Sequence, residues 1–275
     1  MSKRTMLITG CSSGIGYACA VGMRARGWRV FASCRKQEDC DRLRSEGFDA
    51  PRIDYQDEDS IRSGLAEVLD ATGGTLDVLF NNGAYAIPGA TEDLPTDALR
   101  DIFETNVFGW HTLTRAAIPV MRAQGRGRIV QCSSVLGLIA MPWRGAYTAS
   151  KFALEGLADT LRMEMRDTGI DIITIEPGPI TSQFRANSIT QFDRWIDWKG
   201  SARSDQYEAK LIARLHNSTE KSMFTLSPDA VLKKLVHATE STRPRPRYYV
   251  TTPTYLAGFA RRLLPTRALD WVFNR

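Results

Sequence analysis

The sequence predicts a single α/β domain organised around a doubly wound parallel sheet. Two observations carry this prediction. Short apolar runs typical of strands alternate with longer helical patterns as far as residue 178, and a glycine-rich turn joins the first run to the first helical pattern. Helices that connect parallel strands cover both faces of a sheet, and a chain of 275 residues is long enough to bury the core between them.

The expected elements follow one another in order along the chain. Strands are predicted at residues 5–9, 28–33, 50–55, 76–80, 128–132 and 170–175, with helices between them at 14–26, 38–46, 57–72, 96–124 and 146–168. Beyond residue 178 the alternation stops, and residues 182–226 contain aromatic side chains without a strand period. A helix over 227–241, opened by a Ser-Pro pair, and a last strand over 247–251 follow. We therefore expect residues 1–275 to form one domain, with 182–226 inserted after the sixth strand.

The composition argues against several classes of protein. The five cysteines form no Cys-x-x-Cys pair, which favours reduced thiols, and the three histidines have no partner at the local spacings of zinc sites. The net charge of +5 is spread along the chain without a basic stripe, so we expect neither a metal nor a nucleic acid as partner. We find no signal-peptide pattern and no apolar run near the ~18 residues of a membrane span, and we expect a soluble, cytoplasmic protein.

The glycine-rich turn lies at the predicted end of the first strand. Its sequence, Thr-Gly-Cys-Ser-Ser-Gly-Ile-Gly, allows a tight turn and the close approach of a pyrophosphate to the N-terminus of the next helix. On its own the turn is equally consistent with a plain connection between strand and helix. Its place after the first strand of an α/β chain favours a Rossmann-type dinucleotide site. The residues assigned to this site are Gly10, Ser12, Ser13, Gly14, Ile15 and Gly16.

The end of the second predicted strand distinguishes the two nicotinamide cofactors. NAD-specific sites place a carboxylate there for the ribose 2′-hydroxyl, whereas this strand ends in Ser-Cys-Arg-Lys. Arg35 can bind the 2′-phosphate of NADP through charge-assisted hydrogen bonds, although it can also be an ordinary surface cation. We therefore expect NADP(H) as cofactor. Asp54 is a candidate for the adenine amino group or simply a loop acid, and Asn82 and Gly83 follow the fourth predicted strand at the edge where such ligands lie.

A Tyr–Lys pair four residues apart opens the helix predicted near residue 146. Tyr147 and Lys151 share one helix face, so the ammonium can lie near the phenol and lower its pKa toward the range of an acid–base catalyst. Taken alone, such a pair is usually a solvated helix face. Ser134, thirteen residues before Tyr147 at the end of a predicted strand, can orient a substrate oxygen. It is a poor candidate for a nucleophile, because no histidine is near it in sequence and no Gly-x-Ser-x-Gly motif is present.

In this order the motifs resemble the short-chain dehydrogenase/reductase family over nearly the whole chain. The resemblance implies Tyr147 as general acid/base, Ser134 as the group that binds the substrate oxygen, and Lys151 as the group that binds the nicotinamide ribose and lowers the pKa of Tyr147. It also implies that Asn106 holds a water of the proton relay through its backbone, at a disturbed point of its helix. The matching motifs are Thr-Gly-x-x-x-Gly-Ile-Gly (9–16), Asn-Asn (81–82), Asn-Val-x-Gly (106–109), Ser134, Tyr-x-x-x-Lys (147–151) and Pro-Gly (177–178). The residues implied to border the nicotinamide are Pro177, Gly178, Ile180 and Thr181.

The sequence departs from the family pattern at one point and resembles one branch in detail. The family usually reads Asn-Asn-Ala-Gly where residues 81–84 read Asn-Asn-Gly-Ala, for which we expect altered local geometry without loss of cofactor binding. Residues 149–157 resemble the 17β-hydroxysteroid and retinol dehydrogenase branch. Residues 10–13 and 262–265 are similar to bacterial NADP-dependent aldehyde reductases of that branch.

Two segments bear on the substrate and on partners. The insertion 182–226 follows the strand that borders the nicotinamide, so its aromatic residues form either a lid over an apolar substrate or part of the core. Trp143 and Arg144 are further candidates for the wall of the site. The C-terminal extension 252–275 mixes apolar and arginine residues, and we expect it either to contact a membrane surface peripherally or to pack on protein.

The function predicted from the sequence is reversible hydride transfer between NADP(H) and a carbonyl/alcohol pair on an apolar retinoid, steroid or aldehyde. The alternative is a catalytically idle NADP-binding sensor or scaffold. The resemblance also implies a homodimer or homotetramer.

Overall fold

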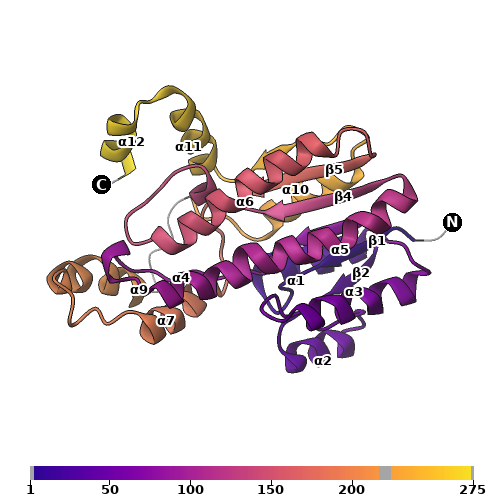
Figure 1. The fold of residues 1–275 in the computed structure, drawn as a ribbon, viewed down its shortest axis with the longest axis horizontal. Helices are drawn as coiled ribbons and strands as arrows, with labels where there is room; N and C mark the ends of the chain where they lie inside the picture. Colours follow the sequence, from indigo (N-terminus) through magenta and orange to yellow (C-terminus); the bar gives the residue numbers. More distant parts are fainter. Residues whose placement is uncertain (1–2, 217–223, 274–275) are drawn as a thin grey trace.

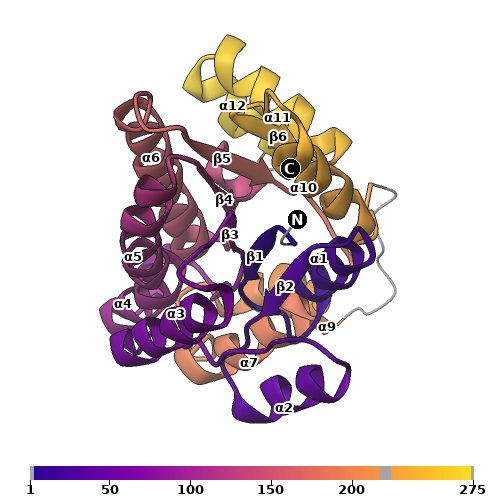
Figure 2. The same ribbon diagram turned by 90° about the vertical axis from the view of Figure 1, so that its right-hand side faces the viewer.

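A single parallel sheet forms the centre of the molecule (Figures 1 and 2), as the sequence predicted, and it has six strands where seven were expected. The computed structural model describes residues 3–216 and 224–273, so residues 217–223 of the expected lid and 274–275 of the C-terminal extension lie outside the described residues. The strand order is β2-β1-β3-β4-β5-β6. The bounds are β1 Thr5–Ile8, β2 Arg29–Ala32, β3 Val78–Asn81, β4 Gly127–Cys132, β5 Ile170–Glu176 and β6 Arg247–Tyr249.

Helices cover both faces of the sheet. Figure 2 shows α3, α5 and α6 on one face and α1 and α10 on the other. The α-helices are α1 Gly14–Ala25, α2 Gln37–Ser45, α3 Glu58–Thr72, α4 Thr96–Phe103, α5 Gly109–Gln124, α6 Gly145–Glu164, α7 Phe184–Trp195, α8 Ser204–Gln206, α9 Ala213–His216, α10 Asp229–Glu240, α11 Thr252–Leu263 and α12 Thr266–Phe273. Short 3-10 turns (η1 Thr91–Asp93, η3 Val135–Gly137) and π-helical turns (η2 Glu104–Phe108, η4 Tyr207–Ile212) complete the elements. None of the described helices is both long and apolar enough to cross a membrane.

The prediction of a strand over residues 50–55 is wrong, because the structure, which describes every residue between β2 and β3, has no strand there. This segment makes only two isolated parallel bridges along the outer edge of β2, between Phe31 and Asp49 and between Cys34 and Arg52. Pro51 has no N–H to donate, so a continuous ladder cannot form at this position. The segment 182–226 consequently follows the fifth strand of the sheet and not a sixth.

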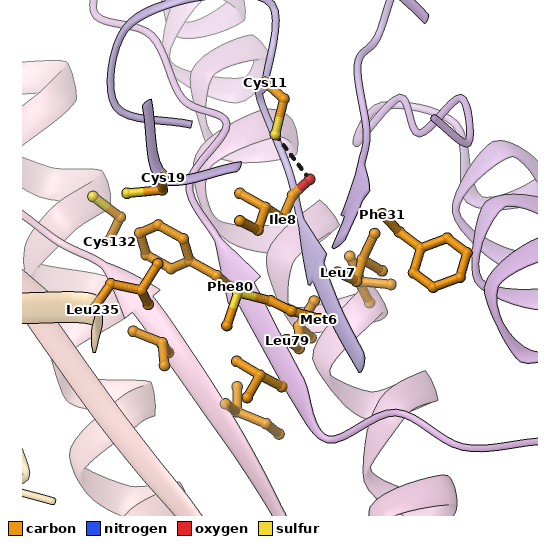
Figure 3. Close-up of a cluster of buried hydrophobic side chains, with 14 of the residues drawn as sticks. Met6, Leu7, Ile8, Cys11, Cys19, Phe31, Leu79, Phe80, Cys132 and Leu235 are labelled. Atoms are coloured by element: carbon orange, nitrogen blue, oxygen red, sulfur yellow. Dashed lines mark hydrogen bonds between the residues drawn. The ribbon is translucent and has the colours of Figure 1, made fainter. Parts of the chain in front are cut away.

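The main core lies between the sheet and its covering helices. Figure 3 shows part of this core, where side chains of β1 and β3 pack with Leu235 of α10. The cysteines belong to it. All five are free and buried, and burial raises the pKa of the Cys132 thiol to about 11. They remain neutral apolar packing groups at physiological pH.

A second apolar cluster forms beside the sheet and contains much of the insertion. Phe192 of α7 and Tyr207 of η4 are buried in it, together with Ile102 of α4 and Tyr147 of α6. For Phe192 and Tyr207 the core interpretation of the aromatic residues is therefore correct. The Tyr207 hydroxyl donates to Asp93 (2.9 Å) and accepts from the Ala90 N–H (2.8 Å), which ties the insertion to the loop after β3.

Two helical glycines offer a matched test of this packing. Alanine normally stabilises a helix interior by about 1 kcal/mol relative to glycine. A Cβ at Gly109 would lie 2.4 Å from the Tyr55 Cβ and 2.5 Å from its carbonyl oxygen, so we expect Gly109→Ala to lower the free energy of unfolding by about 1–3 kcal/mol. Nothing lies within 4 Å of a Cβ at Gly156, so Gly156→Ala should raise it by up to about 1 kcal/mol. Denaturant unfolding measures both, and stabilisation by Gly109→Ala would contradict the close approach of α5 to Tyr55.

Candidate active site

The C-terminal ends of four parallel strands bring the sequence-predicted residues together. The glycine-rich turn follows β1, Asn82 and Gly83 follow β3, Ser134 follows β4, and Pro177 begins the loop after β5. Because all strands run the same way, these ends share one edge of the sheet, which is where ligands of such folds bind. Segments far apart in the sequence thereby line one site.

The glycine-rich turn is pressed against the loop after β3. Gly10 has φ +68°, and a Cβ there would lie 2.6 Å from the Gly83 Cα, so only glycine fits. The Asn82 amide donates to the Thr9 carbonyl (3.0 Å), and the Trp110 indole donates to the Gly83 carbonyl (2.8 Å). A Cβ at Gly83 would meet Gly10 only at 3.4 Å, so alanine would also fit at this point of departure from the family pattern.

The residues at the start of α1 fit a pyrophosphate. Gly14 has φ +57°, and the side chain of Ser13, the N-cap, makes no capping hydrogen bond to the first turn. The N–H groups of that turn and the positive end of the helix dipole are therefore available to an anion. A Cβ at Gly14 would lie 2.9 Å from the Ser182 Cβ, and one at Gly16 would lie 2.3 Å from the Gly10 carbonyl oxygen. No larger residue fits either position without a shift of its surroundings.

A cavity lies beyond the end of β2, between the residues that follow this strand and the segment around residue 52. Arg35 and Asp54 both line it, as do two cations and an acid that we did not predict there: Lys36, Arg52 and Glu38. Arg52 donates to the Arg35 carbonyl (3.0 Å), and the Asp54 carboxylate accepts from the Gln56 N–H (3.1 Å). The cavity thus presents three cations and two carboxylates, and the position at the strand end itself is held by arginine.

Tyr147 and Lys151 are both buried on the inner face of α6. The Lys151 ammonium donates to the Cys132 carbonyl (2.9 Å) at the end of β4 and lies 4.2 Å from the centroid of the Trp110 ring. It lies 5.6 Å from the centroid of the Tyr147 ring. Burial lowers the pKa of Lys151 to about 8, which leaves it mostly charged near neutral pH. The pair therefore faces the sheet and is not a solvated helix face.

The expected lowering of the Tyr147 pKa does not occur in this structure. Burial raises the pKa of Tyr147 well above its usual range, and the nearby Cys132 raises it further. A hydrogen bond with the Ser134 side chain lowers it by less. The Lys151 ammonium is directed to the Cys132 carbonyl, so desolvation of the phenolate is the dominant effect.

Ser134 lies directly opposite the phenol at the end of β4. Its hydroxyl oxygen accepts from the Leu136 N–H (3.1 Å) as the N-cap of η3. The Leu136 N–H uses an acceptor site only, so the Ser134 hydroxyl proton can be donated to the Tyr147 oxygen and, once a substrate is bound, to the substrate oxygen. Ser134 and Tyr147 can thus donate to the same substrate atom.

Asn106 lies in the π-helical turn η2, as expected of a disturbed point in its helix. Its side-chain amide donates to the Tyr85 carbonyl (2.9 Å) and to the Ser150 hydroxyl (3.2 Å). The Ser150 hydroxyl in turn donates to the Tyr147 carbonyl (2.8 Å). Ser150 was not among the predicted residues, although it lies inside the Tyr-x-x-x-Lys motif that pointed to its neighbours.

A partly buried charge cluster joins α6 to the sheet, and nothing in the sequence predicted it. Arg247 of β6 forms ion pairs with Glu155 (2.7 Å), Asp159 (2.7 Å) and Glu176. Glu155 is one helical turn beyond Lys151, and Glu176 immediately precedes Pro177 of the nicotinamide-side loop. The cluster therefore joins α6, the end of β5 and β6 at one point.

An aromatic ring of the insertion packs against the phenol of Tyr147. Phe184, at the start of α7, packs edge-on against Tyr147 with ring centroids 5.4 Å apart and is partly exposed. Trp143 has φ +65° and packs against Tyr207, with ring centroids 4.8 Å apart. Two of the residues predicted to border the nicotinamide contact the other end of the insertion. Thr181 donates its N–H to the Leu226 carbonyl (3.0 Å), and Ile180 forms an isolated parallel bridge with Leu226.

Comparisons with known proteins agree with this architecture. The short chain dehydrogenase family model matches residues 4–192. The chain belongs to the short-chain dehydrogenase/reductase family. Members of this family are oxidoreductases that bind a nicotinamide cofactor, so hydride transfer is the general class of chemistry.

Relatives cover the described fold almost end to end. An uncharacterised oxidoreductase, YbbO of Escherichia coli, is 40% identical over 99% of this chain and 94% of its own length. An NADPH-dependent 3-dehydrocapnine reductase of Ornithobacterium rhinotracheale is 30% identical (99% of this chain, 96% of that protein). Human retinol dehydrogenase 8 is 31% identical (88% and 80%). Among solved structures, a short-chain dehydrogenase from Streptomyces avermitilis matches with a TM-score of 0.80 at 28% identity (99% and 96%).

The charge cluster predicts a pH dependence of stability. Burial, and then the nearby Glu155, raise the pKa of Glu176 to about 8, whereas an unfolded chain releases that proton near pH ~4.3. The folded state binds more protons between these values, so the free energy of unfolding falls as the pH rises from about 5 to about 8. We expect Glu176→Gln to flatten this fall by up to ~1.4 kcal/mol per pH unit.

Denaturant unfolding across this pH range measures the effect. The exposed Glu58→Gln variant is the matched control and should keep the slope of the wild-type protein, because its carboxylate lies in an exposed i,i+4 pair with Arg62. An unchanged slope in Glu176→Gln would show that the proton is held elsewhere.

Proposed function

We propose that this enzyme transfers hydride reversibly between NADP(H) and a carbonyl or alcohol group of an apolar substrate, and works chiefly as a reductase. The observation that carries the proposal is the meeting of Tyr147, Ser134 and Lys151 at one strand edge, next to the glycine-rich turn. A pure binding protein has no need of a buried phenol hydrogen-bonded to a serine beside a buried ammonium.

Each of these side chains has a distinct task in the proposed reaction. Ser134 donates a hydrogen bond to the substrate oxygen and orients it but keeps its proton, while Tyr147 transfers the one proton that this oxygen gains during reduction. Lys151 keeps one N–H on the Cys132 carbonyl and has further N–H groups for the ribose hydroxyls of the cofactor. The nicotinamide, when bound, supplies or accepts the hydride. Asn106 holds Ser150 and the first turn of α6 in place, and its π-helical turn suits the proposed relay water.

The proposed preference for NADP rests on the end of β2. Arg35 is at the position where NAD-specific sites hold a carboxylate, and Lys36 and Arg52 line the same cavity. A guanidinium can make bidentate, charge-assisted hydrogen bonds to a 2′-phosphate. The name of the NADPH-dependent reductase of Ornithobacterium supports the same choice.

The proposed apolar substrate rests on the cluster around the phenol. Tyr147 belongs to an apolar cluster with residues of α4, α7 and η4, and Phe184 packs against its ring beside the place of the reacting oxygen. Such a wall favours a retinoid, steroid or aldehyde over a small charged metabolite. The similarity to retinol dehydrogenase 8 supports this class.

Tyr147→Phe separates the enzyme from the idle binder. Removal of the acid–base hydroxyl should lower kcat by about 10²–10⁴-fold while the Kd for NADPH stays within about twofold, because the hydroxyl is not needed to bind the dinucleotide. NADPH consumption with a panel of retinoid, steroid and aldehyde carbonyls measures turnover, and fluorescence titration measures binding. The surface variant Tyr255→Phe should keep full activity. Undiminished turnover in Tyr147→Phe would overturn the mechanism.

Arg35→Ala tests the cofactor. Loss of a charged contact to the 2′-phosphate should reduce kcat/KM for NADPH by about 10–100-fold and leave that for NADH nearly unchanged. Arg44→Ala removes an exposed arginine of α2 that pairs with Asp41 and should alter neither constant. An equal loss with both cofactors, or a wild-type protein that prefers NADH, sinks the assignment of Arg35.

A further inference from the structure

Helix α11 packs on the body with its small residues and turns its large apolar residues outward. Ala257 and Gly258 are buried, and a Cβ at Gly258 would lie 2.7 Å from the Tyr249 ring, so the helix lies very close to the body on this side. The opposite stripe, at spacings of three and four, is between 49% and 65% exposed: Tyr255, Leu256, Phe259 and Leu263. This is the reverse of the usual arrangement of a surface helix.

Helix α12 continues the same outward apolar character. Among its described residues only Leu269 is buried, whereas Trp271 and Val272 are exposed, and Leu264 is exposed in the link between the helices. Figure 1 shows α12 displaced from the sheet at one end of the molecule. We call the exposed residues Tyr255, Leu256, Phe259, Leu263, Leu264, Trp271 and Val272 the C-terminal apolar face. These side chains leave 38–65% of their surface exposed, and an exposed apolar patch of this kind marks an interaction site.

Basic residues lie on the two helices that form this face, and one lies beside Tyr255. Arg262 and Arg267 belong to the same two helices, and the Lys234 ammonium lies 3.4 Å from the Tyr255 hydroxyl. Lys234 also lines a cavity with Lys233, Arg245 and one acid, Asp229. Within residues 3–216 and 224–273, none of these five cations forms an ion pair with a carboxylate. Helices α11 and α12 together carry three arginines (Arg261, Arg262 and Arg267) and one acid (Asp270), so the two helices that form the face have a net positive charge.

The charge decides between the two occupants that an exposed apolar face can have. A second copy of this chain, paired by a two-fold axis, would bring one cationic rim against another, which is unfavourable. The surface of an anionic bilayer complements the rim, and each basic side chain near such a surface contributes attraction. Trp271 and Tyr255 are also the aromatic types that favour the headgroup level of a membrane.

We propose that the C-terminal apolar face of α11 and α12 seats the protein on the surface of an anionic lipid bilayer. The apolar residues enter the boundary between headgroups and acyl chains, and Arg262, Arg267 and Lys234 contact the lipid phosphates. No described helix is suited to span the bilayer, so the attachment is peripheral and depends on salt.

The attachment lies next to the candidate active site. A Cβ at Gly178 would lie 2.1 Å from the Thr251 hydroxyl oxygen and 3.0 Å from that of Thr254, so the start of α11 touches the nicotinamide-side loop. An apolar substrate dissolved in the bilayer would reach the site along this end of α11. This last step rests on the proposed function, whereas the binding to lipid does not.

Vesicle sedimentation tests the binding. The full chain should sediment with vesicles of phosphatidylcholine and phosphatidylglycerol, less with phosphatidylcholine alone, and less again in high salt. The triple variant Leu256→Ser/Phe259→Ser/Leu263→Ser should lose about tenfold or more in partition coefficient. Met163→Ser, which removes a 54% exposed residue of α6, is the matched control and should bind as the wild-type protein does. Arg262→Glu/Arg267→Glu should weaken binding to the anionic vesicles and abolish the salt effect.

These experiments distinguish three explanations of a result: binding of the face to lipid, contact of the face with a second copy of the chain, and misfolding of a variant. Circular dichroism and a thermal unfolding midpoint like those of the wild-type protein show that each variant is folded, as expected because every substituted side chain is exposed. Failure of the wild-type protein to bind anionic vesicles overturns the proposal. So does a triple variant that binds vesicles normally and changes only the oligomeric state measured by light scattering, because the face would then be a contact between copies. Vesicle binding uses no turnover, so a failed Tyr147→Phe experiment leaves this result unaffected.

Discussion

The burial of one ammonium group constrains the active-site half of the molecule. Lys151 lies inside the protein, and its nitrogen is held by the Cys132 carbonyl and the face of the Trp110 ring, with no carboxylate in salt-bridge contact among the described residues. A buried cation without a counter-ion costs several kcal/mol in desolvation, so its surroundings must supply oriented dipoles. The carbonyl at the end of β4 and the electron-rich indole supply part of the stabilisation that the ammonium loses on leaving water. A bound dinucleotide, with its ribose hydroxyls and phosphates, would be well suited to supply the remainder.

The surrounding contacts follow from the need to hold that group and the phenol at fixed positions. Trp110 can lie under Lys151 only because its indole N–H is satisfied by the Gly83 carbonyl, in the loop that presses on the glycine-rich turn. On the other side, Asn106 and Ser150 hold the first turn of α6 through the Tyr147 carbonyl. The cofactor loop and the catalytic helix are therefore joined through buried hydrogen bonds, and neither can shift without breaking one of them.

The parts of this arrangement that depend on local chemistry could be predicted from the sequence. Glycines at a turn, a polar residue at a strand end and a Tyr–Lys pair one helical turn apart have the same meaning wherever they occur, and the parallel sheet brings them together. The predicted strand at 50–55 failed because a single proline prevented its ladder. The raised pKa of Tyr147 could not be predicted, because it depends on burial in the folded protein. The cluster around Arg247 could not be predicted either, because its partners are about 70 to 90 residues away in sequence.

The same long-range dependence explains how two remote parts of the chain meet at the site. β6 is only three residues long, yet it carries Arg247, which forms ion pairs with Glu155 of α6 and with Glu176, the last residue of β5 before the loop at Pro177. It then continues through Thr251 into α11, whose first turn rests on Gly178. A force on α11 from outside the molecule would therefore act on a loop that is also fixed by a buried charge cluster. Since such a cluster resists displacement, α11 can present its apolar residues outward while the geometry around Tyr147 stays unchanged.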